Sequence, residues 1–433
     1  MFFSSRSFAV VGAAREPEKA GHIIFRNLLE NKNIKVYAVN PNASEVLGER
    51  AYKNLKDVNG SIDCAVIVVK SDYVLDVMKD AVAKKVKCVI LISAGFSEAG
   101  NSELEKKVKD IAEKNNIALL GPNVLGLISV QNNINASFFE GMPVKGSIAL
   151  VSQSGALGVG ILDIAMKEGI GFSGFVSLGN CALSDFSDFI EYFSSDKNTK
   201  VIALYLESLK TGRGKRFLEV CKKCKKPIVV LKSGKSVGGS KAAASHTSAL
   251  ASEQGVYEGI FRQAGVIEVD SISELLNSSR LIDCCGKFGK RACVVTNAGG
   301  LGVLCTDACE KNLIEVVRLP SGVQDKLNLV LPSGWSHNNP VDILGDALAE
   351  RYEKVFGILE KENFFDFYIV LLTPQYMTQS VETARLMTKL KKPVVACFFG
   401  GEKVEEARKI LKENKILVFD DPADVGVVGK IIS

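Results

Sequence analysis

GSIALVSQSGALGVGILDIAM, residues 146–166, is the segment that decides the fold. Its apolar start, Gly146–Val151, is typical of a buried strand, and Ala156–Met166 is typical of a helix. The polar turn Ser152-Gln-Ser-Gly155 joins them. A short apolar strand that leads through a Ser/Gly turn into a helix is the repeating unit of a parallel sheet covered by helices.

The same alternation extends in both directions along the chain. Towards the N-terminus, short apolar strands alternate with helical patterns, and each strand is followed by a polar or small residue. The predicted strands are Phe8–Val11, Lys35–Val39, Cys64–Val69, Cys88–Ile92 and Ile117–Leu120. Apolar strands between amphipathic helices predict an α/β fold whose sheets are buried on both faces.

Two breaks in the alternation divide the chain of 433 residues, which has room for two to four domains. Ser129–Lys145 is polar and irregular, and we expect it to be a linker; Asp283–Arg291 is the second break. The predicted domains are therefore 1–130, 146–285 and 290–433. The last two look related, because VSQSGALGV at Val151–Val159 parallels VTNAGGLGV at Val295–Val303.

Composition narrows the function classes. Hydrophobic residues make up 47% and charged residues 24%, and the formal net charge is +5. The basic runs are short and lack aromatic residues, which disfavours nucleic acid, and no apolar run reaches the roughly 20 residues of a membrane span. The 11 cysteines lie mostly in apolar segments, so we expect a cytoplasmic protein that uses cysteine as a small hydrophobe. Cys221-Lys-Lys-Cys224 lacks a second pair at zinc spacing, which favours a helix-end coincidence over a metal or redox site.

The first domain has the pattern of a nucleotide-binding sheet. Gly12 ends the first strand and Gly21 opens the next helix, although the loop between them is not GxGxxG. The second strand ends in Asn40-Pro41, where NAD enzymes have an acid, and Arg15 can contact a phosphate. These residues favour a 3′-phosphorylated nucleotide such as coenzyme A over NAD; a loop that binds nothing is the alternative. The expected contacts are Gly12, Ala13, Arg15, Gly21, Asn40, Pro41, Val69, Ser93, Gly95 and Asn123.

The second domain carries the residues expected to do chemistry. Ser152, Ser154 and Gly155 enter a helix, where hydroxyls, free N–H groups and the helix dipole favour a phosphate; simple N-capping is the alternative. Glu207 ends the strand Val201–Leu206, at the edge where ligands collect. It could hold one nitrogen of an imidazole so that the other attacks phosphorus, or it could be a solvated strand-end acid.

His246 is one of three histidines and lies in KSGKSVGGSKAAASHTSALA, Lys232–Ala251. Small residues around it leave room for movement and expose backbone N–H groups to an anion, which fits a nucleophile that carries a phosphoryl group. The other two histidines are weaker candidates. His22 follows the proposed nucleotide loop, and His337 lies in a predicted loop where a turn role is favoured.

In this order, several motifs resemble the α subunit of ADP-forming acyl-CoA synthetases (acetate–CoA ligases) and, more distantly, that of succinyl-CoA synthetase. The resemblance runs from about Phe8 to the C-terminus. Its motifs are SQSGALG (Ser152–Gly158), VSLGN (Val176–Asn180), IALYLES (Ile202–Ser208), KAAASHT (Lys241–Thr247), VTNAGGLGVL (Val295–Leu304), NPVDILGDA (Asn339–Ala347) and LLTPQ (Leu371–Gln375).

The resemblance implies a Rossmann-like CoA-binding domain followed by two flavodoxin-like α/β domains. It implies the reversible reaction acyl-CoA + ADP + phosphate ⇌ carboxylic acid + CoA + ATP, through an acyl phosphate and a phosphohistidine. In this reading His246 takes the phosphoryl group, Glu207 orients it, and Ser152, Ser154 and Gly155 bind phosphate. No ATP-grasp domain is expected here, so a separate β subunit in an α₂β₂ assembly would supply the ADP/ATP and Mg²⁺ sites, and no metal site is expected on this chain.

Some positions depart from the family pattern, which puts substrate range and rate in doubt. They are Ser248 where glycine is usual, Ser252, Gln254 in place of an acid, Lys70 in place of a proline, and Cys181 in place of a lysine. Two rival functions stay open at this point. One is a non-catalytic CoA-binding regulatory subunit, and the other is a nicotinamide-dependent enzyme. The acid that is used is not identified by the sequence.

Overall fold

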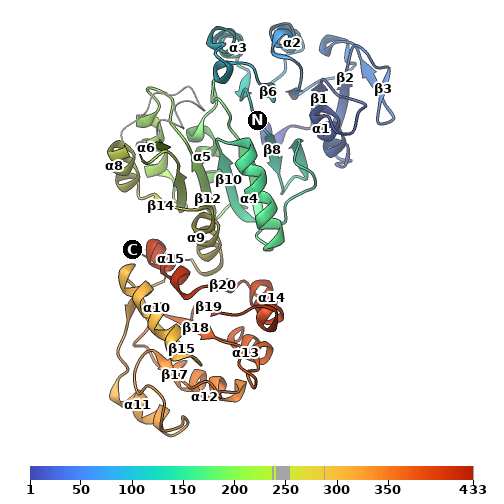
Figure 1. The fold of residues 1–433 in the computed structure, drawn as a ribbon. Coiled ribbons are helices and arrows are strands. Elements are labelled where there is room, and N and C mark those ends of the chain that lie inside the picture. The colour runs from blue at the N-terminus through green and yellow to red at the C-terminus, as the bar shows by residue number, and fades with distance from the viewer. Residues whose placement is uncertain (237, 240–253, 287, 433) are drawn as a thin grey trace. The chain divides into compact units, whose positions relative to one another are not determined.

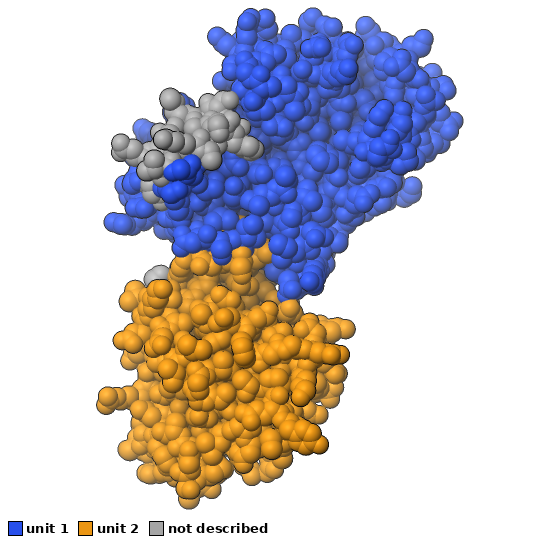
Figure 2. Space-filling view, viewed as in Figure 1, with its two compact units in different colours: residues 1–272 blue, residues 273–433 orange. Residues whose placement is uncertain are grey.

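The computed structural model describes residues 1–236, 238–239, 254–286 and 288–432. The chain forms two compact units, residues 1–272 and 273–433, which Figure 2 shows in blue and orange. Unit 1 contains two sheets and unit 2 contains one. In the part of the chain that the structure describes, no helix is both long and apolar enough to cross a membrane.

The first sheet of unit 1 has the order β3-β4-β2-β1-β5-β6-β7. Apart from the β3–β4 hairpin its strands are parallel, and β4 to β7 follow the 3-2-1-4-5-6 order of a Rossmann fold. Helices α1 and α2 follow the two central strands (Figure 1). The elements are β1 (Ser7–Val11), α1 (Ala20–Leu29), β2 (Lys35–Val39), β3 (Glu45–Val46), β4 (Glu49–Tyr52), β5 (Cys64–Ile67), α2 (Ser71–Ala83), β6 (Cys88–Leu91), α3 (Ser102–Lys114) and β7 (Ala118–Leu120).

The second sheet has the order β14-β13-β12-β10-β11-β8-β9. Its parallel strands β11-β10-β12-β13-β14 have the 2-1-3-4-5 order of flavodoxin, and the hairpin β8–β9 joins antiparallel to β11. The elements are β8 (Gly126–Ser129), β9 (Ile134–Ser137), β10 (Lys145–Ser152), α4 (Gly155–Lys167), β11 (Phe172–Ser177), α5 (Phe186–Ser195), β12 (Val201–Leu206), α6 (Gly214–Lys223), β13 (Ile228–Lys232), α8 (Gln254–Ala264) and β14 (Ile267–Val269). The next helix, α9 (Ile272–Cys285), belongs to unit 2 except for its first residue.

The hairpin corrects one prediction. Residues 129–145, expected to be a linker, contain β9 and end where β10 begins, so they belong to the second sheet. The polar side chains that suggested a linker form hydrogen bonds within this segment. The Asn135 amide donates to the carbonyls of Phe139 (3.1 Å) and Gly141 (2.8 Å), and the Ser137 hydroxyl donates to Asn135 Oδ1 (2.6 Å). Buried polar groups of this kind are stable once they are hydrogen-bonded.

Unit 2 repeats the flavodoxin-like order. Its sheet is β16-β15-β18-β19-β20, and β17 also pairs with β15. The turns after β10 and β15 are built alike: the Ser152 hydroxyl donates to the carbonyl of Ser154 (2.6 Å), and that of Thr296 donates to the carbonyl of Ala298 (3.0 Å). The elements are β15 (Arg291–Thr296), α10 (Gly299–Lys311), β16 (Glu315–Val316), α11 (Ser321–Asn328), β17 (Val341–Asp342), α12 (Ala349–Leu359), β18 (Phe367–Leu372), α13 (Ser380–Met387), β19 (Val394–Phe398), α14 (Glu405–Glu413), β20 (Leu417–Phe419) and α15 (Val427–Ile432).

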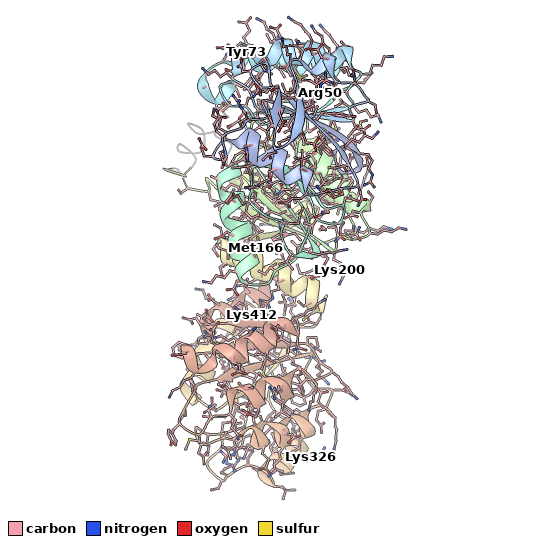
Figure 3. The ribbon with its side chains drawn as sticks, turned by 90° about the vertical axis from the view of Figure 1, so that its right-hand side faces the viewer. Arg50, Tyr73, Met166, Lys200, Lys326 and Lys412 are labelled. Carbon is pink, nitrogen blue, oxygen red and sulfur yellow. The ribbon has the colours of Figure 1, made fainter. Side chains whose placement is uncertain are left out.

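The two sheets of unit 1 share one hydrophobic core. The N-terminal segment helps to join them, because Phe3 of the first domain stacks on Tyr192 of α5 with ring centroids 4.1 Å apart, and it also meets Phe193 edge-on. Exposed side chains such as Tyr73 on α2 and Met166 on α4 lie on the outside (Figure 3). A shared core fixes the position of the two sheets relative to one another within this unit.

Candidate active site

The turn between β10 and α4 is shaped to receive an anion. Ser154 caps the helix, because its Oγ accepts a hydrogen bond from the backbone N–H of Leu157 (3.3 Å). Ser152 is buried, and its hydroxyl stabilises the turn internally. Gly155 is the first helical residue, so free backbone N–H groups and the positive end of the helix dipole lie at this turn. Capping by Ser154 is therefore compatible with the predicted binding of an anion at this turn.

Glu207 lies across the switch point of the second sheet from this turn. Strands β10 and β12 are neighbours, with Ser152 opposite Tyr205, and the helices that follow a flavodoxin-like sheet change sides here. Gln153, which the sequence analysis did not single out, connects the two strand ends. Its Oε1 accepts from the backbone N–H groups of Glu207 and Ser208, both at 3.0 Å. The turn after β10 therefore fixes the backbone that carries Glu207.

A buried cation lies at the next strand end. Lys232 ends β13, is 5% exposed, and places its ammonium group 4.6 Å from the centre of the Tyr257 ring. Burial lowers the pKa of Lys232, and the negative charge of Glu207 acts in the opposite direction. For the Tyr205 phenol, burial raises the pKa, and the negative charge of Glu207 raises it further. Sequence reasoning missed Lys232 because its strand reads as uniformly apolar up to its last residue.

His246 lies outside the described residues, as do Ser248 and Ser252. The segment that contains it follows β13 and precedes α8. Strand β13 ends at Lys232 and pairs with β12, the strand that Glu207 follows, and α8 leads into β14 of the same sheet. The role of His246 remains a proposal that rests on the sequence.

In the first domain, the loop after β1 packs very closely against its surroundings. Gly12 has φ +97°, and a Cβ there would lie 2.2 Å from the carbonyl oxygen of Val68. A Cβ on Gly21, at the start of α1, would lie 2.0 Å from the carbonyl oxygen of Gly12. Only glycine fits either position, and this brings the start of α1 against the loop, as in dinucleotide-binding folds. The Lys19 side chain makes no capping hydrogen bond to this helix.

Several of the predicted nucleotide contacts shape the loops around this site. Asn40 donates to the carbonyl of Ala13 (2.7 Å), so it holds the loop after β1. The Ser93 hydroxyl donates to the carbonyl of Val69 (2.5 Å) and also accepts from its N–H (3.2 Å), which closes the turn after β5. A contribution of these two side chains to coenzyme binding would act mainly through loop geometry.

The remaining predicted contacts lie on or near the surface. Arg15, Pro41 and Asn123 are exposed, and Gly95 is half-buried with φ +102°. They follow β1, β2, β7 and β6, which places all of them at the carboxyl edge of the first sheet. Arg15 is the one cation among the ten predicted contacts, and its exposure leaves it able to reach a phosphate.

The two candidate sites adjoin. A Cβ on Gly155 would lie 3.4 Å from the backbone N of Leu125, in the segment after β7, and 3.5 Å from Ser177 Oγ. That Ser177 hydroxyl accepts from the N–H of Leu125 (3.0 Å). The start of α4 therefore touches the chain that leaves the carboxyl edge of the first sheet. A ligand that spans both edges could bring a reacting group of the first site to an anion in the second.

The other candidates take structural roles. His22 is buried, with Nδ1 3.0 Å from the carbonyl of Ala14, and His337 contacts the carbonyl of Ser333 and Oδ1 of Asn328, both at 3.0 Å. Burial raises the pKa of Cys181 to about 12, which makes this thiol unreactive. Among the described residues no group of three or more potential metal ligands occurs.

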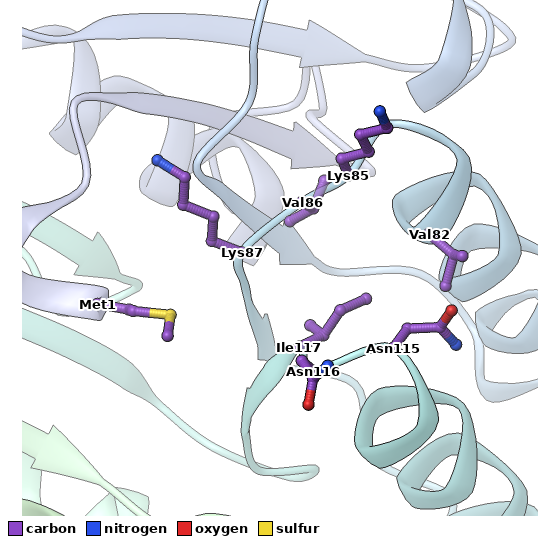
Figure 4. A pocket seen from close by; sticks show the side chains of 8 residues that line it. All are labelled: Met1, Val82, Lys85, Val86, Lys87, Asn115, Asn116 and Ile117. Carbon is purple, nitrogen blue, oxygen red and sulfur yellow. The ribbon is translucent and has the colours of Figure 1, made fainter.

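A pocket of about 460 Å³ lies elsewhere in the first domain (Figure 4). It is lined by residues such as Val82, Lys87 and Ile117, which are near the C-terminal ends of helices and the amino ends of β6 and β7. This is the edge of the sheet opposite to the candidate site. The pocket is therefore separate from the site described above.

Comparisons with known proteins agree with this architecture. Three family models match in order: a CoA binding domain at residues 6–129, a succinyl-CoA ligase like flavodoxin domain at 145–282 and a ligase-CoA domain at 292–430. The chain is 39% identical to the α subunit of acetate–CoA ligase [ADP-forming] II from Pyrococcus furiosus, over 98% of this chain and 95% of that one. This chain belongs to the ADP-forming acetate–CoA ligase family. The resemblance given by the sequence motifs is thereby confirmed.

A solved structure confirms the fold of this family member. The chain matches acetyl-coenzyme A synthetase 1 of Ca. Korarchaeum cryptofilum, in complex with phosphate and ADP, with a TM-score of 0.95 and 34% identity, covering 100% of this chain and 95% of that one. The fold predicted from the sequence, a Rossmann-like domain followed by flavodoxin-like domains, is confirmed. The family also includes longer chains: this chain spans 61% of acetate–CoA ligase [ADP-forming] I from Archaeoglobus fulgidus, at 40% identity.

Proposed function

We propose that this chain is the α subunit of an ADP-forming acyl-CoA synthetase. It would catalyse acyl-CoA + ADP + phosphate ⇌ carboxylic acid + CoA + ATP together with a partner. The observation that carries the proposal is the contact between the start of α4, with its Ser152–Gly155 turn, and the segment after β7 that leaves the edge of the CoA-binding domain. Phosphate and the thioester of acyl-CoA could meet there.

The first step would take place at the turn after β10. Phosphate held by Ser154, Gly155 and the N–H groups of α4 attacks the thioester carbonyl. The C–S bond breaks, CoA leaves as thiolate, and an acyl phosphate forms. The helix dipole stabilises the phosphate charge throughout. This step needs both domains of unit 1, which a shared core holds together.

The second step would move the phosphoryl group to His246. A ring nitrogen attacks phosphorus, the bond from phosphorus to the carboxylate oxygen breaks, and the free carboxylic acid leaves as its anion. Glu207 would accept a hydrogen bond from the other ring nitrogen, which selects the reactive tautomer and stabilises the phosphohistidine. Lys232 lies near Glu207 and would partly balance the negative charge that accumulates.

The last step would take place with a partner. The Pyrococcus furiosus relative is named as a subunit, and the longer Archaeoglobus relative extends beyond this chain. We infer a separate ATP-grasp β subunit that binds Mg²⁺ and ADP and receives the phosphoryl group from His246. An α₂β₂ assembly in the cytoplasm, with a small acid such as acetate as substrate, completes the proposal.

ATP formation tests this function. The chain is mixed with its candidate ATP-grasp partner, acetyl-CoA, ADP, Mg²⁺ and phosphate, and ATP is measured with luciferase. We expect ATP only when all components are present. CoA binding without ATP formation by a competent partner would favour the regulatory alternative, and tight binding of NADH in a titration would favour the nicotinamide alternative.

A further inference from the structure

A polar cluster connects the two domains of unit 1 beside the candidate site. Its centre is Asn180, in the segment that follows β11. The Asn180 amide nitrogen lies 2.5 Å from Glu98 Oε2, 2.9 Å from Glu105 Oε2 and 3.1 Å from Ser97 Oγ, all three in the first domain. One amide group therefore bridges two carboxylates on the other side of the domain boundary.

Glu98 connects Asn180 to the turn after β6. Its Oε1 accepts from the backbone N–H groups of Gly95 (2.5 Å) and Phe96 (3.1 Å), while Oε2 faces Asn180. Burial alone would raise the pKa of Glu98, but the hydrogen bonds from Asn180, Gly95 and Phe96 hold it below its ordinary value. The ionised Glu98 carboxylate thus stabilises, through hydrogen bonds, a turn that belongs to the proposed coenzyme site.

Glu105 connects the same cluster to the loop after β12. Its Oε2 accepts from the Ser97 hydroxyl (2.6 Å) and backbone N–H (3.2 Å). Its Oε1 lies 3.6 Å from the ammonium group of Lys210, three residues beyond Glu207. The cluster therefore touches the coenzyme edge of the first domain and the catalytic edge of the second.

The backbone around Asn180 completes the connection. The N–H of Leu178 donates to the carbonyl of Ser152 in the phosphate turn (2.8 Å). Two residues later, the N–H of Asn180 donates to the carbonyl of Pro122 (3.0 Å), and that of Ala182 donates to the carbonyl of Gly121 (3.0 Å). A short segment thus runs from the phosphate turn to the edge of the first sheet, and Asn180 is its side-chain contact with Glu98.

We propose that Asn180 is a positioning residue that sets the distance between the coenzyme turn at Gly95 and the phosphate turn at Ser152. The inference rests on the proposed function. It assigns Asn180 to the step in which phosphate and the thioester react, because only this step needs both turns at once. Transfer of phosphate between ATP and His246 does not use the Gly95 turn, so it should not depend on the distance between the two turns.

The test compares two partial reactions in the complex with the ATP-grasp partner. In Asn180→Ala, we expect kcat for acetyl-CoA-dependent ATP formation to fall by about tenfold to a hundredfold, since misplacement of reacting groups by about 1 Å has effects of that size. Labelling of the chain from γ-32P-ATP should stay at the wild-type rate. Glu103→Gln is the matched control. Glu103 lies on α3, the helix that carries Glu105, but it forms an exposed ion pair with Lys107.

A second pair of variants keeps the test decisive if Asn180→Ala does not fold. Glu98→Gln places an N–H donor against the donor of Asn180 and should also slow ATP formation selectively. Asn180→Gln keeps an amide donor in the same segment and should retain part of kcat. Wild-type kcat in Asn180→Ala or Glu98→Gln, or an equal loss of both partial reactions, would overturn the positioning role. Wild-type enzyme that forms no ATP would instead refute the proposed function.

Discussion

Gln153→Ala tests whether Gln153 holds the Glu207 carboxylate in position. Gln153 is 7% exposed, and its Oε1 accepts from the N–H groups of Glu207 and Ser208, both at 3.0 Å. An unpaired buried N–H costs about 1–3 kcal/mol. Glu207 is buried and Ser208 is half-buried, so the combined cost is about 2–3 kcal/mol.

The same free energy, about 2–3 kcal/mol, sets the size of the expected decrease in the rate of phosphoryl transfer. If the strand end that carries Glu207 relaxes to satisfy its N–H groups, the carboxylate leaves its position for the histidine. A loss of 2–3 kcal/mol in the transition state corresponds to a rate lower by about 30- to 150-fold. The assay is the rate of 32P incorporation from γ-32P-ATP in the presence of the partner, with urea unfolding of each variant measured in parallel.

Ser173→Ala is the control for this experiment. The Ser173 hydroxyl lies 2.7 Å from the Thr199 hydroxyl, in the same sheet but at its amino edge. Its loss should lower the free energy of unfolding by about 1 kcal/mol and leave the labelling rate unchanged. Labelling by Gln153→Ala at the wild-type rate, despite the expected loss of stability, would refute the reasoning that Gln153 positions Glu207.

Three further predictions concern other parts of unit 1. A hydrogen bond from Lys87 is the main cause that lowers the pKa of Asp63 to about 2, so this carboxylate stabilises the fold above its unfolded pKa and loses that effect as the pH falls towards 2. Because Lys87 is exposed, Asp63→Asn should cost about 1 kcal/mol at pH 7 by urea unfolding, and a difference that persisted at pH 2 would contradict this. Cys181 should resist iodoacetamide at pH 8 in the native protein and react only after unfolding, as mass spectrometry can show. Gly12→Ala should lower Tm and weaken CoA binding in calorimetry, since its Cβ would meet Val68 O at 2.2 Å; unchanged values of both would show that the loop adapts.

Much of the fold could be predicted from local pattern. The strand Lys35–Val39 was predicted with its observed bounds, and the helix predicted at Ala156–Met166 is α4 with one more residue at each end. Buried parallel strands are continuous apolar runs, so composition alone locates them. The hairpin at β8–β9 was missed because Asn135 and Ser137 read as solvent-exposed, whereas their hydrogen bonds allow burial.

The candidate site was predictable only where it follows strand ends. Ser152 and Glu207 were each predicted at the carboxyl end of a strand, and the structure shows that these two strands are neighbours. Gln153 and Asn180 were not foreseen as linking residues, although both lie in quoted motifs. Their partners are 54 and 82 residues away along the chain, and one-dimensional patterns carry no information on such contacts.

The most direct test of the central claim is the phosphohistidine itself. The chain, its ATP-grasp partner, Mg²⁺ and γ-32P-ATP are mixed, and label on this chain is tested for loss in acid and retention in base. We predict acid-labile, base-stable label on the wild-type chain and none on His246→Ala, while both bind CoA with the same affinity. Equal label on the two proteins, or no label with a partner that is shown to be active, would contradict the assignment of His246 as the phosphoryl carrier.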